Sequence, residues 1–266
     1  MEKNSDELRK SFLALSSEWN KPSKDLNLIE NKLKSLRIDL TKYSFLPPNS
    51  EDVQNTELLM ARDTIEIATY YSVERKDIEE FKNNYSQLKY YYFDYKSGLP
   101  ESPFKYELIG LSLLSLLAQG KLADFHTELE LLSREELERH IYLSFPVSLE
   151  QFLAAGSFHK LFLSKESMPT KTFSFFMDML LETVRDEIAG CIETAYTVLD
   201  FNETKKILNI TDDGKMKSIG LSRKWKLGSN KKYHFHDSDD DMDNENLFES
   251  TTKVMLHYTK ELEQIV

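Results

Sequence analysis

Cysteine, glycine and proline are all scarce in this sequence of 266 residues. A single cysteine, Cys191, cannot form a disulfide within the chain, and the polar start MEKNSDELRK lacks the apolar run of a signal peptide. The 8 glycines and 7 prolines are roughly half of the usual share of about 12%. These shortages disfavour disulfide-rich secreted proteins, all-β folds, collagen-like repeats and low-complexity chains, and they indicate a reduced, intracellular protein.

Long hydrophobic runs and a surplus of positive charge are missing too. The most apolar stretch, LIGLSLLSLLA, spans only residues 108–118, whereas a membrane helix needs about 20 residues. We interpret it as a buried core helix and expect no membrane partner. The net charge of −11 argues against nucleic acid or anionic lipid as a default partner. The hydrophobic share of 40% is enough for a sizeable core in one or two domains.

Helical periodicity dominates the first part of the chain. Apolar residues at steps of three and four predict one helix near residues 8–19 and a second from Leu26 to Tyr43, which form a hairpin across the NKPSKD break. Further helices are predicted at about 50–71, 74–90, 103–120 and 122–132. The stripe of the second helix consists of Leu26, Ile29, Leu33, Leu36, Leu40 and Tyr43, and that of the first of Leu8, Phe12, Leu15 and Trp19.

Capping signals divide the following segment into shorter helices. Ser133 with Glu136 has the spacing of a capping box, and so has Ser148 with Gln151 just after Pro146, so each pair predicts a helix start. Ala155-Gly156-Ser157 predicts a tight turn. No sequence repeat of fixed period is present, and the lengths of the elements alone favour a helical-repeat (TPR-like) solenoid over residues 1–165.

The pattern changes after Pro169. A long helix near 173–196 is followed by a helix from Asp200, another after Thr211, and a β-hairpin whose Gly228-Ser229-Asn230 turn separates residues 224–227 from 231–235. Three helices and a hairpin predict a winged-helix module over 166–236. An acidic linker is predicted at 237–246 and an amphipathic helix at 247–266. The fold class is therefore mainly α, with a small β-hairpin.

Catalytic signatures are missing as well. The sequence has no Gly-rich phosphate loop, no GxSxG, no HExxH and no CxxC. Cys191 lies in an apolar helical pattern where a free cysteine packs as a small hydrophobe. His234 and His236 would share one strand face, but two histidines beside an acidic loop favour solvated hairpin residues over a metal site. We expect no enzyme activity, no cofactor and no metal.

The hairpin region is basic although the chain is acidic. Residues 201–235 contain nine Lys and Arg against three acidic residues. One interpretation is a winged helix that binds DNA through a helix and the wing. The alternative is an exposed strand edge that pairs with a neighbouring protein. For that alternative the contact residues would be Trp225, Leu227, Tyr233 and Phe235.

The last helix carries an apolar stripe beyond the acidic linker. Such a helix is marginal in water alone and must bury its stripe. It either folds back on its own domain or docks into a helical bundle made with other chains, and the reach of the linker, about 33 Å, favours the bundle. The stripe consists of Leu247, Thr251, Val254, Met255, Tyr258, Leu262 and Ile265.

Several segments together point to a known family. They are FKNNYSQLKYYYFDY (81–95), LIGLSLLSLLAQGKLADFHTELELL (108–132), LEQFLAAGSFHKLF (149–162), VRDEIAGCIETAY (184–196) and the ending EQIV. The most specific of them contains RDEIA at 185–189. These segments resemble the PCI-domain family of scaffold subunits, and within it the small PCI subunits of the proteasome regulatory lid. Small PCI subunits of the signalosome and of translation initiation factor three are the near alternatives.

The resemblance implies a non-catalytic assembly subunit of a hetero-oligomer in cytoplasm and nucleus, acting in ubiquitin-dependent protein degradation. Similar subunits join their winged helices edge to edge and send their C-terminal helices into a common bundle that helps to couple the lid to the ATPase base. The strands around Trp225 and Tyr233 to Phe235 would form the first contact, and Leu247 to Val266 the second. The partners would be other PCI and lid subunits, which makes nucleic acid the weaker alternative.

Overall fold

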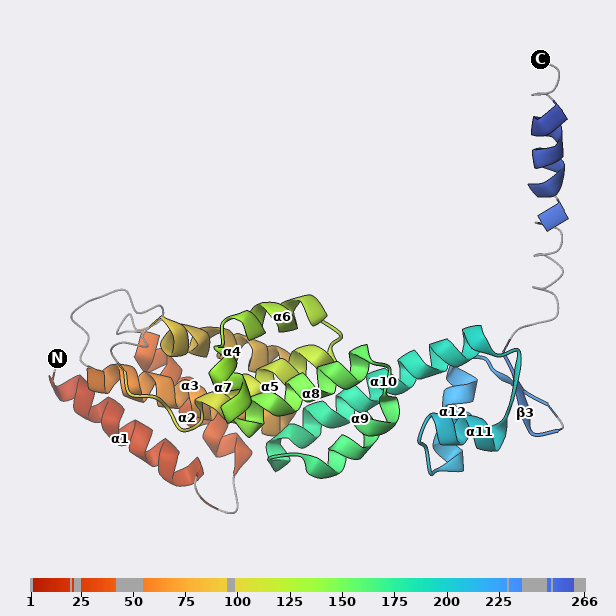
Figure 1. Cartoon of the computed structure of the whole chain (residues 1–266). Helices are drawn as coiled ribbons and strands as arrows, with labels where there is room; N and C mark the ends of the chain where they lie inside the picture. The colour runs from red at the N-terminus through yellow and green to blue at the C-terminus, as the bar shows by residue number, and fades with distance from the viewer. Residues whose placement is uncertain are drawn as a thin grey trace. The chain divides into compact units, whose positions relative to one another are not determined.

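The structure is a computed structural model that describes residues 2–19, 21, 25–41, 55–94, 99–228, 230–235, 248–249 and 251–260. The chain divides into two compact units, residues 1–183 and 184–266 (Figure 1). A compact unit need not coincide with a domain, so the domain boundaries inferred from the sequence, after residues 165, 236 and 246, stay predictions.

The first unit is built from consecutive helices, as predicted. Neighbours in the sequence pack on one another, α1 on α2 and α3 on α4, and α5 packs on α8 (Figure 1). The elements are α1 (Glu2–Trp19), α2 (Leu26–Thr41), α3 (Asn55–Arg75), α4 (Ile78–Phe93), α5 (Lys105–Ala118), α6 (Leu122–Glu130), α7 (Arg134–Arg139), α8 (Ile141–Ala154), α9 (Phe158–Ser164) and the 3-10 helices η1 (Lys165–Ser167) and η2 (Lys171–Phe173).

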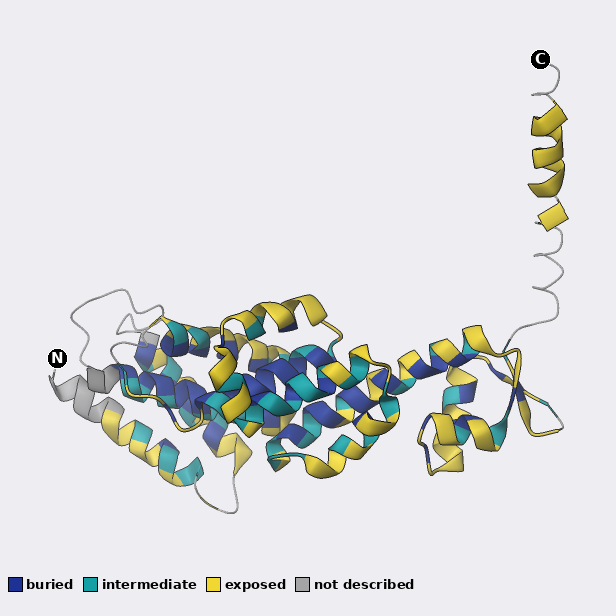
Figure 2. Cartoon of the chain, in the orientation of Figure 1, coloured by how far each residue is buried: buried dark blue, intermediate teal, exposed yellow. Residues whose placement is uncertain are grey.

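The core of this unit centres on α5, the helix of the apolar run. Leu108, Ile109, Leu111 and Leu113 are at most 1% exposed, and Figure 2 shows the helix in the colour of buried residues along most of its length. The interpretation of the run as a buried core helix is thus confirmed. Among the helices that the structure describes, none has the length and apolarity to span a membrane.

The apolar stripe of α2 is largely confirmed. Ile29, Leu33, Leu36 and Leu40 are buried. Leu26 is exposed, so its assignment to the buried stripe is wrong; it is the first residue of the helix, where the buried face has not yet begun. Tyr43 lies outside the described residues.

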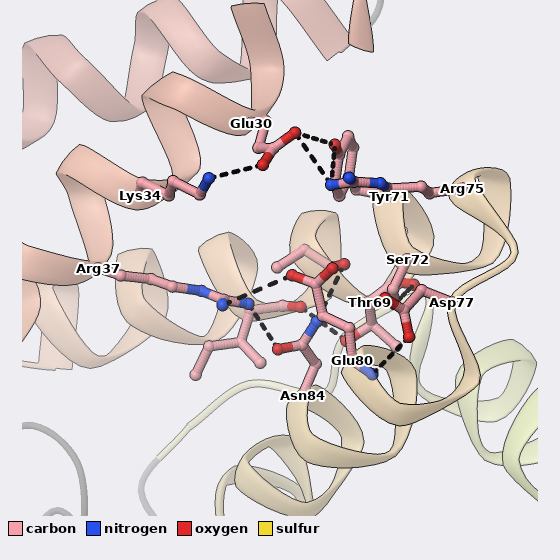
Figure 3. A network of polar contacts seen from close by, with 12 residues as sticks. Glu30, Lys34, Arg37, Thr69, Tyr71, Ser72, Arg75, Asp77, Glu80 and Asn84 are labelled. Carbon is pink, nitrogen blue, oxygen red and sulfur yellow. Dashed lines mark hydrogen bonds and ion pairs between the residues drawn. The ribbon is translucent and has the colours of Figure 1, made fainter. Parts of the chain in front are cut away.

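Polar contacts fasten α2 to α3 and α4 (Figure 3). The Glu30 carboxylate accepts hydrogen bonds from Lys34 of its own helix, at 2.6 Å, and from Tyr71 and Arg75 of α3, both at 3.0 Å. On α4, the buried Asn84 accepts from Arg37 Nη2 at 2.5 Å and donates to the Ala68 carbonyl at 3.2 Å. Because Asn84 is 1% exposed, satisfying both ends of its amide is a condition for burying it.

Of the two predicted capping boxes, one is confirmed and one is wrong. Ser133 caps α7 and Glu136 reciprocates. Ser148 starts no helix, because α8 runs from Ile141 through Pro146 to Ala154, and the Ser148 hydroxyl donates to the Ser144 carbonyl at 2.8 Å. The predicted turn after α8 is confirmed, with Gly156 at φ +65 and the Ser157 N–H bonded to the Phe152 carbonyl at 2.8 Å.

The second unit contains the predicted winged-helix arrangement. Its helix α10 (Ser174–Ala195) starts in the first unit, since the division falls after Thr183. The further elements are β1 (Val198–Asp200), α11 (Phe201–Ile207), α12 (Asp213–Ser222), β2 (Lys226–Leu227) and β3 (Lys232–His234). The hairpin of β2 and β3 is confirmed, whereas the sequence analysis missed β1, which pairs antiparallel with β3 and completes a sheet of order β1-β3-β2. The result is a mainly α, PCI-type fold.

Part of the predicted last helix is also described. Residues 248–249 and 251–260 are helical, as expected from the stripe. Residues 236–247, and with them the predicted linker, lie outside the described residues.

Candidate protein-interaction sites

The sheet of the second unit has two edges within the described chain, β1 and β2. At the β2 edge, Leu227 lies opposite Tyr233, and Tyr233 lies opposite Leu199 of β1, so the three side chains form one row across one face. Tyr233 in the middle of this row and Leu199 at its β1 end are buried, whereas Leu227 at its β2 end is 49% exposed. The β2 edge therefore presents an accessible apolar side chain at the rim of the sheet.

The four residues predicted for this contact fall into two groups. Trp225 and Tyr233 are buried, at 7% and 2% exposure, whereas Leu227 is exposed and Phe235 is half-buried. The Trp225 ring meets those of Tyr233 and Phe235 edge-on, with centroids 5.4 and 5.0 Å apart. Trp225 and Tyr233 thus form the small core that supports the sheet, and Leu227 with part of Phe235 remains accessible.

A polar clamp holds this core to α10. The Trp225 indole Nε1 donates to Glu193 Oε1 at 2.6 Å. Arg223 reaches the same carboxylate at 3.3 Å and donates to the Asp186 carbonyl at 2.7 Å. Because these bonds connect α10 to the residues just before β2, they fix the position of the strand edge relative to the helix.

The surface around the hairpin is basic, as its composition predicts. Lys205 is paired with Asp213, and this bond lowers the pKa of the Asp213 carboxyl. Lys231 closes the hairpin turn with a φ of +54, its N–H donating to the Gly228 carbonyl at 3.1 Å. The other exposed lysines of α11, α12 and the hairpin are Lys206, Lys215, Lys217, Lys224, Lys226 and Lys232.

The C-terminal helical segment exposes the stripe that the sequence predicts. Val254, Met255 and Tyr258 are about 70% exposed, and Thr251 is exposed as well (Figure 2). Large apolar side chains at such exposure lack the burial that stabilises an isolated helix. Leu247, Leu262 and Ile265 lie outside the described residues.

The residues weighed for chemistry remain scattered. Cys191 is exposed on α10, so the interpretation of it as a packed small hydrophobe is wrong. His234 is exposed on β3, and His236 lies outside the described residues. In the described part of the chain, no three His, Cys, Asp or Glu side chains gather in a way that would hold a metal ion.

Two parts of the site were not predicted from the sequence. Strand β1 has only three residues, although the β-branched and apolar run Thr197-Val198-Leu199 before the Asp200 cap is a usable signal. The clamp of Glu193 and Arg223 joins residues 30 positions apart, and no local pattern marks such a pair.

Known proteins are similar to this chain in sequence. Residues 103–243 match the model of the CSN8/PSMD8/EIF3K family. The 26S proteasome non-ATPase regulatory subunit 8 homolog A of Arabidopsis thaliana is 40% identical over 71% of this chain and 72% of its own length. The 26S proteasome non-ATPase regulatory subunit 8 of Caenorhabditis elegans is 32% identical over 97% of this chain and 98% of its own length.

A fungal relative extends the similarity. The 26S proteasome regulatory subunit RPN12 of Saccharomyces cerevisiae is 31% identical over 83% of each chain. The matched family region contains the winged-helix elements together with α5 to α9, so the similarity covers the sheet edge as well as the core helix. The chain therefore belongs to the CSN8/PSMD8/EIF3K family.

Proposed function

We propose that this protein is a non-catalytic subunit of the regulatory-particle lid of the 26S proteasome, where it supports lid assembly, lid–base association and ubiquitin-dependent degradation. The names of the relatives, which are regulatory subunits of the 26S proteasome, support this assignment. Its partners would be other PCI and lid subunits, and its location the cytoplasm and the nucleus.

The exposed stripe of the C-terminal helical segment is the observation that carries the proposal. Val254, Met255 and Tyr258 leave large apolar surfaces in water, which is the property of a helix that awaits a partner. The stripe Leu247, Thr251, Val254, Met255, Tyr258, Leu262 and Ile265 would be buried in a helical bundle made with other subunits.

The second proposed contact is the β2 edge of the winged helix. A neighbouring subunit would pair with the backbone of β2 and cover Leu227 and Phe235. Trp225 and Tyr233 would contribute indirectly, because their buried rings support the two strands. The clamp by Glu193 and Arg223 would keep the edge in a fixed place on the winged helix.

A matched pair of substitutions tests the helix. Two residues along a helix correspond to a rotation of about 200°, so Leu256 lies on the face opposite Val254 and Tyr258. Leu256 is also 66% exposed, which makes Leu256→Asp a control of the same chemistry. We expect Tyr258→Asp to block incorporation into the lid, as removal of residues 247–266 would, and Leu256→Asp to allow it. Native-gel co-migration of the Tyr258→Asp chain with intact lid would contradict the proposal.

Affinity purification at low salt, with mass spectrometry of the captured proteins, separates the assignment from its alternatives. Proteasome subunits would support it, whereas signalosome or initiation-factor-three subunits would replace it by another PCI assembly.

The exposed lysines around the hairpin favour one second candidate, a nucleic-acid-binding winged helix. A gel shift of nucleic acid that weakens with salt and disappears in Lys231→Glu/Lys232→Glu would support this candidate.

A further inference from the structure

A cavity of about 450 Å³ in the first unit lies apart from both proposed contacts. Its walls come from the last turns of α1, from the middle of α3 and from the residues just before α5. The volume falls within the range of about 300–1,000 Å³ that small-molecule sites occupy.

Aromatic rings line this cavity from three segments. Trp19 of α1 lies 6.4 Å from Tyr70 of α3, centroid to centroid, and Tyr70 lies 5.9 Å from Phe104, edge-on at 82°. Phe12, two turns before Trp19, adds a fourth ring to the lining. Phe104 is 49% exposed, so this ring is accessible from solvent. The negative faces of such rings attract cations.

The charged residues of the cavity leave an excess of negative charge. Arg62 is its cation, and this guanidinium is already engaged: Nη1 donates to the Pro100 carbonyl at 2.7 Å, and Nε and Nη2 donate to Asp63 Oδ1 at 3.1 and 2.9 Å. The second carboxylate, that of Glu66, accepts from Tyr92 at 2.7 Å and lies 3.5 Å from Arg62 Nε. Two carboxylates thus share one guanidinium.

The two acidic groups differ in accessibility. Glu66 is 4% exposed, and burial raises the pKa of its carboxyl despite the neighbouring Arg62. The single guanidinium therefore does not fully offset the desolvation of the buried carboxylate. The Asp63 side chain is 38% exposed, and Arg62 bonds to its Oδ1 alone. In the described part of the chain Asp63 Oδ2 accepts no hydrogen bond, and it belongs to the more exposed of the two carboxylates.

We propose that this cavity binds the guanidinium of an arginine side chain from a partner protein, stacked on Phe104 beside Trp19 and paired with Asp63. A guanidinium is planar, stacks on aromatic faces and binds carboxylates. It therefore suits both the aromatic rings and the carboxylate that line the cavity. The two carboxyl groups of the lining disfavour phosphate and other anions. A lysine ammonium satisfies the carboxylate but lacks the flat surface for stacking.

The two tryptophans of the chain provide both the probe and its internal control. Trp19 lines the cavity, whereas the Trp225 indole is engaged with Glu193 in the other unit. In full-length protein with ¹⁵N-labelled indoles, we expect Nα-acetyl-arginine methylamide to shift the Trp19 signal saturably, with a Kd on the order of 1 mM, and to leave the Trp225 signal in place. Nα-acetyl-citrulline methylamide has the same shape without the charge and is expected to bind at least about tenfold more weakly.

Two substitutions at one position isolate the stacking. Phe104→Leu keeps apolar volume but removes the ring and is expected to weaken arginine binding severalfold, whereas Phe104→Tyr keeps the ring and is expected to retain binding. Because Phe104 is half exposed, both variants should fold. Asp63→Asn is expected to weaken binding about fivefold or more.

Each contrary outcome overturns the proposal. If the arginine and citrulline probes bind equally, the cavity does not recognise the charge. If the corresponding lysine probe, Nα-acetyl-lysine methylamide, binds as tightly as the arginine probe, the cavity does not prefer a guanidinium. A Trp19 signal that does not saturate up to about 50 mM probe, or equal affinity of Phe104→Leu and Phe104→Tyr, removes the site itself.

Discussion

The carbonyl oxygen of Tyr142 on α8 lies against the Cα of Gly110 on α5, within the space that the Cβ of any larger residue would occupy. The reason lies one turn further along α8. Pro146 has no N–H to donate to the Tyr142 carbonyl, which therefore lacks its usual helical partner. Gly110 gives this carbonyl room at the place where the two helices pack, and the proline and the glycine together set how closely α5 and α8 approach.

Gly110→Ala should destabilise the first unit for this reason. A Cβ at Gly110 would overlap Tyr142 O and lie 3.2 Å from Phe173 Cζ, so the backbone of α8 must move. We expect a net loss of about 1–3 kcal/mol, the usual cost of overpacking a core, even though alanine is the better helix former. Urea unfolding monitored by circular dichroism measures the loss.

Gly190→Ala is the matched control. Gly190 lies within α10, and the nearest atom to its added Cβ is Arg223 Nη1 at 3.9 Å. The same substitution is therefore expected to be neutral or to stabilise by up to about 1 kcal/mol. Equal destabilisation by both substitutions would show that the Tyr142 contact plays no special part.

The two serines with capping-box spacing should respond differently to alanine. Ser133 accepts from the Glu136 N–H at 3.3 Å, so Ser133→Ala should cost about 0.5–2 kcal/mol. Ser148 lies inside α8, and among the described residues its hydroxyl bonds only to the Ser144 carbonyl, so Ser148→Ala should be within about 0.5 kcal/mol of wild type. The denaturant midpoints of the two variants measure these losses of stability. A larger loss for Ser148→Ala than for Ser133→Ala would contradict the continuous α8.

Glu30 should make stability depend on pH in the acid range. Its bonds to Lys34 and Tyr71, and the charge of Arg75, lower the pKa of the carboxyl from 4.5 to about 2. Because the folded pKa lies below the unfolded one, this contribution is present above pH 4.5 and is lost as the pH falls towards 2. Glu30→Gln cannot titrate, so the gap in melting temperature between wild type and variant should close over this window.

Salt provides the control for Glu30. The pairs with Lys34 and Arg75 are largely open to solvent, so about 1 M NaCl should shrink the gap already at pH 7. A gap between wild type and Glu30→Gln that is constant from pH 6 to 2.5 would contradict the lowered pKa.

Glu193 should stabilise the winged helix as the hydrogen-bond acceptor of the Trp225 indole, and not through its charge alone. Glu193→Ala leaves the buried Trp225 indole N–H without a partner, for which we expect a loss of about 1–3 kcal/mol. Glu193→Gln keeps an acceptor and should lose less. In a Trp19→Phe background, Trp225 fluorescence reports this unit alone. The same loss in both variants would assign the effect to the ion pair with Arg223 instead.

Much of the helical fold was predictable because its signals are local. The stripe Ile29 to Leu40, the box at Ser133 and the turn at Gly156 depend on residues a few positions apart, and each is confirmed. The start of α4 is displaced from the predicted residue 74 to Ile78, because α3 continues to Arg75 and Asp77 accepts from the N–H groups of Glu79 and Glu80.

The features that sequence reasoning missed depend on distant partners. Pro146 is tolerated within α8 because Gly110, 36 positions earlier, makes room for the carbonyl it frees. Strand β1 exists through its pairing with β3, whose residues follow some 35 positions later. For the candidate interaction site, alternation correctly placed the hairpin, but only the packing of Trp225 on Tyr233 shows which side chains the second unit buries.

The short edge strand limits how long a partner can stay. With two residues, β2 turns the N–H and C=O of about one residue away from β3. At about 0.5–1.5 kcal/mol for each hydrogen bond, a strand added there slows dissociation only modestly. Such an edge orients a partner without holding it, so residence time in any complex built on it must be set by a second contact elsewhere on the chain.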